Sequence, residues 1–294
     1  MSLMILYMNT NNFRNSNLFQ YTISRTFSVK GIGLHTGELC QINLSPANLN
    51  KGIYFIRKDI DTFHIPAKSN FILNTHLNTS IGFNANSAIR TIEHLMASLI
   101  ALKISNLRVE VYGPEIPILD GSASCWTQLI INSRIKIQQL PLKINFLKRI
   151  MFIKCQDSFL LVFPSKVFSI TYGIDFESTR IISKQWFTHF PQMYGEFHLL
   201  ISAARTFGIL RQVKFLKKMG MVQGANLRNA WLCTNNIWLN DLSKFDNEPV
   251  KHKVLDLLGD LNLTTNFMTM KIIAYKSNHT LHIGLSKAIK NQKP

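Results

Sequence analysis

Three side chains capable of metal binding or acid–base chemistry recur at helical spacing in segment 250–261 (VKHKVLDLLGDL): His252, Asp256 and Asp260. At about 100° per residue they form one stripe of a helix whose opposite face is apolar. A histidine and an aspartate one turn apart offer a nitrogen and an oxygen ligand in a geometry that zinc accepts. The plainer alternative is a solvated polar face, and a second segment bears on the choice.

Segment 91–102 (TIEHLMASLIAL) carries an adjacent Glu93–His94 pair. Its apolar residues recur at i, i+3, i+4, i+7 and i+8 from residue 92, which predicts an amphipathic helix. His94 lies opposite that apolar face and Glu93 at its border. Two histidines and one carboxylate are typical of a catalytic rather than a structural zinc site, because they leave the fourth position to water. Glu93 is then a candidate base for that water.

Composition narrows the class of protein. The 294 residues allow one large or two medium domains, and a hydrophobic content of 46% favours a globular chain. No apolar stretch approaches the roughly 20 residues of a membrane-spanning helix, and residues 1–8 are too short and lack the basic start of a signal peptide. The four cysteines lie far apart, which argues against a thiolate zinc site and fits a reducing compartment.

The formal net charge of +17, from 33 Lys+Arg against 16 Asp+Glu, points to an anionic partner. A nucleic-acid-binding protein is the alternative that this charge favours. The chain lacks a basic stripe interleaved with aromatics, a recognition-helix pattern and zinc-finger spacing, so we expect no nucleic-acid partner. A composition rich in Ile, Asn, Lys and Phe, typical of an AT-rich genome, explains much of the charge.

The patterns predict two halves, each made of strands followed by helices. In the first half we expect strands at 21–29, 39–46, 52–58, 107–113 and 135–139, and helices at 91–102 and 123–131. In the second half we expect strands at 149–154, 158–164, 168–176 and 269–277. The second half also predicts a helix ending near Ala204, a basic amphipathic segment at 209–220, and helices at 250–261 and 281–290.

Six separated motifs together resemble the UDP-3-O-acyl-N-acetylglucosamine deacetylases, the zinc enzymes that commit bacteria to lipid A synthesis. The motifs follow the family's order, at 31–38 (GIGLHTGE), 91–96 (TIEHLM), 114–123 (PEIPILDGSA), 204–208 (ARTFG), 252–261 (HKVLDLLGDL) and 274–279 (AYKSNH). The resemblance implies an α+β fold of two similar domains, each a β-sheet layer packed on helices in a β-α-α-β sandwich, with the active site between them. We expect a poorly ordered extension at 1–19, domain I at 20–140 and domain II at 141–294.

The resemblance also assigns the metal site and the base. The family's zinc ligands match His94, His252 and Asp256, and the predicted cofactor is Zn²⁺. Zinc held by two imidazoles and a carboxylate lowers the pKa of water toward about 7. Glu93 then accepts a proton from water as that water attacks the acetamide carbonyl.

Three further catalytic positions carry over from the family. Thr206 matches the residue whose hydroxyl helps to hold the oxyanion, although a local backbone hydrogen bond is its plainer interpretation. His279 matches the histidine that supplies positive charge and the proton for the departing amine. Asp260 would orient His279 and keep it cationic. The family has glycine before this histidine, and here Asn278 is the non-glycine residue that best tolerates a positive φ.

Substrate contacts follow from the same resemblance. Lys253 matches a lysine near the nucleotide diphosphate, and Phe176 and Phe207 match aromatic positions on the nucleotide and sugar side. An exposed lysine and core phenylalanines are the plainer alternatives. An insert at about 206–232 corresponds to the family's passage for the acyl chain. We therefore expect a cytoplasmic monomer acting on a UDP-linked acylated glucosamine, with transient contact with the inner-membrane surface. An inactive, drifted homologue is disfavoured because all seven candidate ligand and catalytic residues are present.

Overall fold

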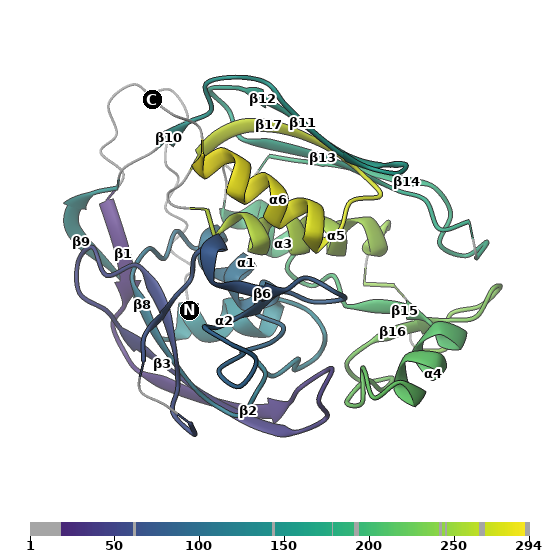
Figure 1. Ribbon diagram of the computed structural model, residues 1–294, viewed down its shortest axis with the longest axis horizontal. Helices are drawn as coiled ribbons and strands as arrows, with labels where there is room; N and C mark the ends of the chain where they lie inside the picture. Colours follow the sequence, from purple (N-terminus) through teal and green to yellow (C-terminus); the bar gives the residue numbers. More distant parts are fainter. Residues whose placement is uncertain are drawn as a thin grey trace, which may run out of the picture.

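Two β-sheets enclose a double layer of helices in the computed structural model (Figure 1). The structure describes residues 19–60, 63–142, 145–177, 179–190, 194–240, 243–244, 246–264 and 268–291. The expected N-terminal extension lies outside these residues, except for Phe19. Among the described residues, no helix combines the length and hydrophobicity needed to cross a membrane.

The first sheet has the strand order β2-β3-β8-β4-β5. It is antiparallel except where β4 runs parallel to β8. Helix α1 lies between β4 and β8 along the chain, and α2 follows β8. The bounds are β2 (Phe27–Ile32), β3 (Leu39–Pro46), β4 (Ile53–Arg57), β5 (Ile65–Pro66), α1 (Glu93–Ala101), β8 (Leu107–Tyr112) and α2 (Ser124–Asn132).

The second sheet repeats this plan with the order β11-β12-β17-β13-β14. Here β13 runs parallel to β17 and the other pairs on this path are antiparallel. Helix α5 lies between β13 and β17 along the chain, and α6 follows β17. The bounds are β11 (Met151–Cys155), β12 (Ser158–Pro164), β13 (Ser169–Ile174), β14 (Gln185–His189), α5 (Glu248–Leu261), β17 (Met268–Tyr275) and α6 (His279–Lys290).

The two halves stack through their helices, since α1 packs on α5 between the sheets. The expected α+β fold of two similar layers is therefore confirmed. The boundary after residue 140 stays a prediction. Helix α5 is buried on nearly every side: His252, Asp256 and Asp260 are 4%, 2% and 0% exposed. The polar stripe predicted from its spacing is thus an interior one, and the alternative of a solvated face is wrong.

Smaller elements complete the chain. A parallel pair, β15 (Phe207–Ile209) and β16 (Trp231–Cys233), flanks α4 (Leu210–Lys218), and this unit projects to one side of the layers (Figure 1). The remaining elements are β1 (Phe19–Ile23), the 3-10 turn η1 (Ser69–Phe71), β6 (Ile72–Asn74), β7 (Ser80–Ile81), β9 (Ile135–Pro141), β10 (Asn145–Phe146) and α3 (Tyr194–Leu200).

Several predicted boundaries differ from the structure. The strand expected at 21–29 is two strands, because the chain turns at 24–26 to move β1 out to pair with β9. The helix expected to end near Ala204 ends at Leu200, and the closing helix begins at His279 rather than at residue 281. The short strands β14, β15 and β16 were not predicted.

Candidate metal centre and active site

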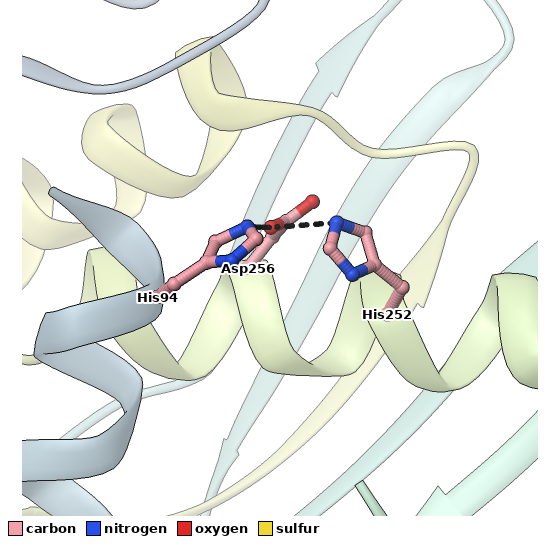
Figure 2. A group of neighbouring side chains, drawn as sticks. All are labelled: His94, His252 and Asp256. Atoms are coloured by element: carbon pink, nitrogen blue, oxygen red, sulfur yellow. Dashed lines mark ion pairs between the residues drawn. The ribbon is translucent and has the colours of Figure 1, made fainter. Parts of the chain in front are cut away.

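Helices α1 and α5 approach closely enough to bring residues from both halves of the chain together. A Cβ atom built on Gly259 of α5 would lie 2.1 Å from the backbone oxygen of Glu93 on α1. Only a residue without a side chain permits this separation. The contact places His94, next to Glu93, beside the His252 and Asp256 side chains of α5 (Figure 2).

The His94, His252 and Asp256 side chains form a triangle of ligand atoms. The Asp256 Oδ1 atom lies 3.5 Å from His252 Nε2 and 3.9 Å from His94 Nε2. Two ligands bound at about 2.0–2.1 Å in a tetrahedral site lie roughly 3.3 Å apart, so the gap among these atoms is of metal size. His252 Nδ1 donates to the Ala204 carbonyl oxygen at 3.1 Å, which leaves Nε2 free as a ligand.

Electrostatics favour the ligand forms of these three groups. Burial, and then the neighbouring His252, lower the pKa of His94 to about 4, so His94 is neutral at pH 7. Burial raises the pKa of Asp256, but Lys253 and the nearby histidines outweigh it and hold that pKa well below its usual range. Burial also lowers the pKa of His252, so the donor set of two neutral imidazoles and one carboxylate fits a divalent metal ion.

Lys253 stands beside the metal triangle. Its Nζ donates to Asp256 Oδ2 at 2.8 Å, the carboxylate oxygen that does not face the histidines. It also lines the cavity described below. Lys253 is thus neither a free surface lysine nor remote from the site.

A second buried group centres on Asp260. Its Oδ2 accepts from His279 Nδ1 at 2.7 Å and from His282 Nδ1 at 2.8 Å, and its Oδ1 accepts from Thr79 Oγ1 at 2.6 Å. These are hydrogen-bond separations, well below the roughly 3.3 Å between two ligands of a tetrahedral metal. We therefore interpret this group as a hydrogen-bonded network.

The network sets the charge of His279. Burial lowers the pKa of this imidazole, but attraction to the Asp260 carboxylate and the hydrogen bond that His279 donates to it outweigh burial and raise the pKa to about 9. Because Nδ1 is bound to Asp260, the Nε2–H of the imidazolium is the proton available to the cavity that His279 lines.

Glu93 lies in the same cavity with a different environment. It is 3% exposed, and its Oε2 accepts from the Thr79 backbone N–H at 3.1 Å. Burial raises the pKa of this carboxyl to about 8. Glu93 is thus a carboxyl group that can take up a proton near neutral pH.

A cavity of about 450 Å³ joins these groups and lies between the two halves. The first half contributes Leu34, residues 74–77 and α1, and the second contributes β15, α5 and the start of α6. Every predicted site residue except Asp260 lines it: Glu93, His94, Phe176, Thr206, Phe207, His252, Lys253, Asp256 and His279. Asp260 lies behind His279 and bears on the cavity through it.

The remaining predicted residues sit along one wall. Phe176 and Phe207 pack edge to face at 5.5 Å, and Phe207 also contacts the His252 ring at 6.0 Å. The Thr206 hydroxyl donates to the Gly121 carbonyl at 3.2 Å, so the local backbone bond of the plainer interpretation is present while the residue still lines the cavity. Arg205 anchors this wall, because its Nε donates to the buried Glu248 of α5 at 2.8 Å.

Sequence reasoning missed two residues of the site. Thr79 holds both Glu93 and Asp260, and His282 shares Asp260 with His279. The signal for His282 was its i+3 spacing from His279, which a helix starting at residue 281 concealed. Asn278 also differs from expectation, since its φ of −143° is extended and its side chain caps α6 by accepting from Leu281 N–H.

Comparisons with known proteins agree with this geometry. The family model for UDP-3-O-acyl N-acetylglycosamine deacetylase (LpxC) matches residues 20–291. A UDP-3-O-acyl-N-acetylglucosamine deacetylase from Nostoc sp. is 37% identical over 275 residues, which cover 92% of this chain and 98% of the relative. Proteins of the same name from Synechocystis sp. and Cyanidium caldarium are 38% and 37% identical, covering 92% and 93% of this chain and 98% and 99% of the relatives. The chain belongs to the UDP-3-O-acyl-N-acetylglucosamine deacetylase family.

Proposed function

We propose that this protein hydrolyses the acetamide of UDP-3-O-acyl-N-acetylglucosamine, releasing acetate in the committed step of lipid A biosynthesis. The observation that carries the proposal is the metal-sized triangle of His94, His252 and Asp256 at the floor of a cavity that also contains Glu93 and His279. Family membership supplies the substrate class.

We propose zinc as the metal, held by His94, His252 and Asp256. When bound, the metal supplies positive charge that polarises the carbonyl and lowers the pKa of water. Two imidazoles and a carboxylate accept several divalent metals, so the add-back experiment below includes more than zinc.

Glu93 is the proposed general base. Burial raises its pKa to about 8, and a nearby divalent cation would favour its carboxylate form. The carboxylate takes one proton from water while the water oxygen forms its bond to the acetamide carbon. The Thr79 N–H fixes one Glu93 oxygen, so the side chain is already oriented before substrate arrives.

His279, Asp260 and Thr206 serve the later part of the reaction. The His279 cation faces the negative charge that develops on the carbonyl oxygen, and its Nε2 proton passes to the amine nitrogen as the carbon–nitrogen bond breaks. Asp260 holds the cation by its Nδ1–H at 2.7 Å. Thr206 can add a hydroxyl donor by turning from Gly121 toward the cavity. Acetate and a free amine result.

The other walls of the cavity suit the rest of the substrate. Phe176 and Phe207 offer an aromatic surface for the sugar and nucleotide, and Lys253 offers positive charge for a phosphate. Leu34 and Ile209 add apolar lining to the cavity, and Ile209 lies in the predicted acyl-chain insert at 206–232.

We propose a cytoplasmic monomer that touches an anionic lipid surface through α4. One chain supplies every residue of the site, and all four cysteines are free, which fits a reducing compartment. No Asp or Glu occurs at 197–240. Helix α4 exposes Arg211, Lys214 and Lys218. Phe215 on the same helix and Met219 at its C-terminal end are each 62% exposed. Cations flanked by exposed apolar side chains are typical of a surface that lies on anionic lipid.

Deacetylation of UDP-3-O-(hydroxyacyl)-N-acetylglucosamine by the purified protein tests the proposed function. We expect turnover that a chelator abolishes and zinc restores, with iron and cobalt added back in parallel. UDP-N-acetylglucosamine, which lacks the acyl chain, is the matched control and should react far more slowly. Turnover that survives complete metal removal would contradict the metal-dependent mechanism.

A further inference from the structure

His282 is a buried titratable residue that the mechanism above does not use. It is 0% exposed and lies on α6, one turn after His279. Its Nδ1 lies 2.8 Å from Asp260 Oδ2, and His279 Nδ1 lies 2.7 Å from the same oxygen. One carboxylate oxygen therefore binds two imidazoles, of which only His279 lines the cavity.

We infer that His282 is a positioning residue for the deacetylation: it holds the Asp260 carboxylate in the orientation that aligns His279. The inference rests on the proposed function and extends it to a residue outside the cavity. With Thr79 bound to Oδ1 and His282 bound to Oδ2, Asp260 is fixed at both oxygens before His279 adds its own hydrogen bond.

Contacts on both sides of the His282 ring hold it in place. Its Nε2 lies 2.9 Å from Ser277 Oγ and 3.4 Å from the Tyr172 hydroxyl. Tyr172 donates to the Ser277 carbonyl oxygen at 2.7 Å, and the Ser277 hydroxyl donates to the Tyr172 oxygen at 2.8 Å, so both groups are held in place beside the ring. Because a carboxylate oxygen can only accept a hydrogen bond, the His282 nitrogen that faces Asp260, Nδ1, carries a proton.

Charge in the network supports a neutral His282. The ionisable groups that face it are Asp260 of α5, His279 of its own helix and Tyr172 of β13. Burial lowers the pKa of His282, although Asp260 opposes this. His279 already supplies the one positive charge that balances Asp260, so His282 acts as a neutral donor.

Two substitutions distinguish the hydrogen bond that His282 donates to Asp260 from the space that its side chain fills. His282→Leu fills much of the space without a donor, whereas the side-chain amide of His282→Asn branches from Cγ as Nδ1 does and can donate to Asp260. We expect His282→Leu to lower kcat at least tenfold, with KM within about twofold and bound metal unchanged. His282→Asn should recover most of that loss. Equal losses in the two variants, or an unchanged kcat in His282→Leu, would overturn the inference.

A double-mutant cycle with Asp260→Asn tests the route of the effect. If His282 acts through Asp260, adding His282→Leu to Asp260→Asn costs little further kcat, whereas an independent packing role would add in full. Should His282→Leu fail to fold, Ser277→Ala removes the hydroxyl that contacts His282 Nε2 and helps to hold the ring, and a smaller kcat loss at unchanged KM is expected. Wild-type protein without turnover would refute the proposed function; wild-type turnover with additive losses refutes only this inference.

Discussion

Glu93 and Asp256 lie on facing helices, yet their surroundings shift the pKa values of the two carboxyl groups in opposite directions. Burial dominates at Glu93 and raises its pKa to about 8. At Asp256 burial is outweighed by Lys253 and the histidines, which hold its pKa well below the usual range. A permanent anion suits a metal ligand, and a carboxyl that titrates near neutrality suits proton transfer.

Replacing Glu93 tests this division of roles. Glu93→Gln keeps an oxygen for the Thr79 N–H but cannot take up a proton, so we expect kcat to fall about 10²- to 10⁴-fold. Metal content by atomic spectroscopy should stay at one ion per chain, because Glu93 is not a ligand. In contrast, His252→Ala should lose both metal and activity. A fully active Glu93→Gln would rule out the proposed base.

The pH dependence should report the Asp260–His279 pair. The pKa of His279 is raised to about 9, so its cation, the proposed active form, is lost as pH rises through 9, and kcat should fall there. The pair's contribution to folding stability has the same sign: it is full below about 6.5 and disappears above 9.

Asp260→Asn removes the carboxylate charge that raises this pKa, and burial then lowers it. We expect the alkaline fall in kcat to move to lower pH, as measured over pH 6–10. Asp157→Asn, which removes an exposed carboxylate on the turn between β11 and β12, is the matched control and should leave the profile in place. An alkaline limb that does not move in Asp260→Asn would contradict the assignment to His279.

At the scale of elements, the contact between α1 and α5 determines the metal site. Gly259→Ala would place a Cβ 2.1 Å from the Glu93 backbone oxygen, so the helices must separate. We expect a stability loss of about 1–3 kcal/mol and weaker metal binding, since His94 moves away from α5. Gly284→Ala in α6 is the control: a Cβ there meets nothing within 4 Å, and helix propensity predicts a gain of up to about 1 kcal/mol. Thermal unfolding and metal titration distinguish the two variants.

The helices that carry the site were predictable because their periodicity is strong, and the strands β3, β4, β8 and β12 because apolar and β-branched residues recur between clear breaks. The strands β15 and β16 have three residues each, too few for a pattern. The burial of α5 was not visible either, since spacing identifies a polar stripe but not what covers it.

The same limit applies to the site. His94, His252 and Asp256 share motifs that local sequence exposes. Thr79 and His282 reach Asp260 across 181 and 22 residues of the chain. Thr79 carries no local signal, and the i+3 spacing of His282 from His279 becomes informative only once α6 is known to begin at His279.

At the scale of the whole molecule, both halves use one strand order, with a parallel strand pair joined by α1 in the first half and by α5 in the second. These two connecting helices are therefore equivalent in topology and meet at the centre of the molecule (Figure 1). Helix α1 contributes His94 to the ligand triangle, and α5 contributes His252 and Asp256. Neither half alone contains the ligand triangle, so metal binding requires both to fold and pack.

Vesicle binding can depend either on the cations of α4 or on the net charge of the whole molecule, and lysine substitutions at different places distinguish the two. If α4 lies on anionic lipid, Lys214→Gln with Lys218→Gln removes two contacts of about 1 kcal/mol each and weakens vesicle binding roughly 30-fold. Lys136→Gln with Lys166→Gln, on β9 and after β12, removes the same charge far from α4 (Figure 1). Sedimentation with phosphatidylglycerol vesicles at low salt should separate the two pairs. Equal weakening would mean that the net charge of +17, rather than α4, drives the attraction, because only a local contact depends on where the charge lies.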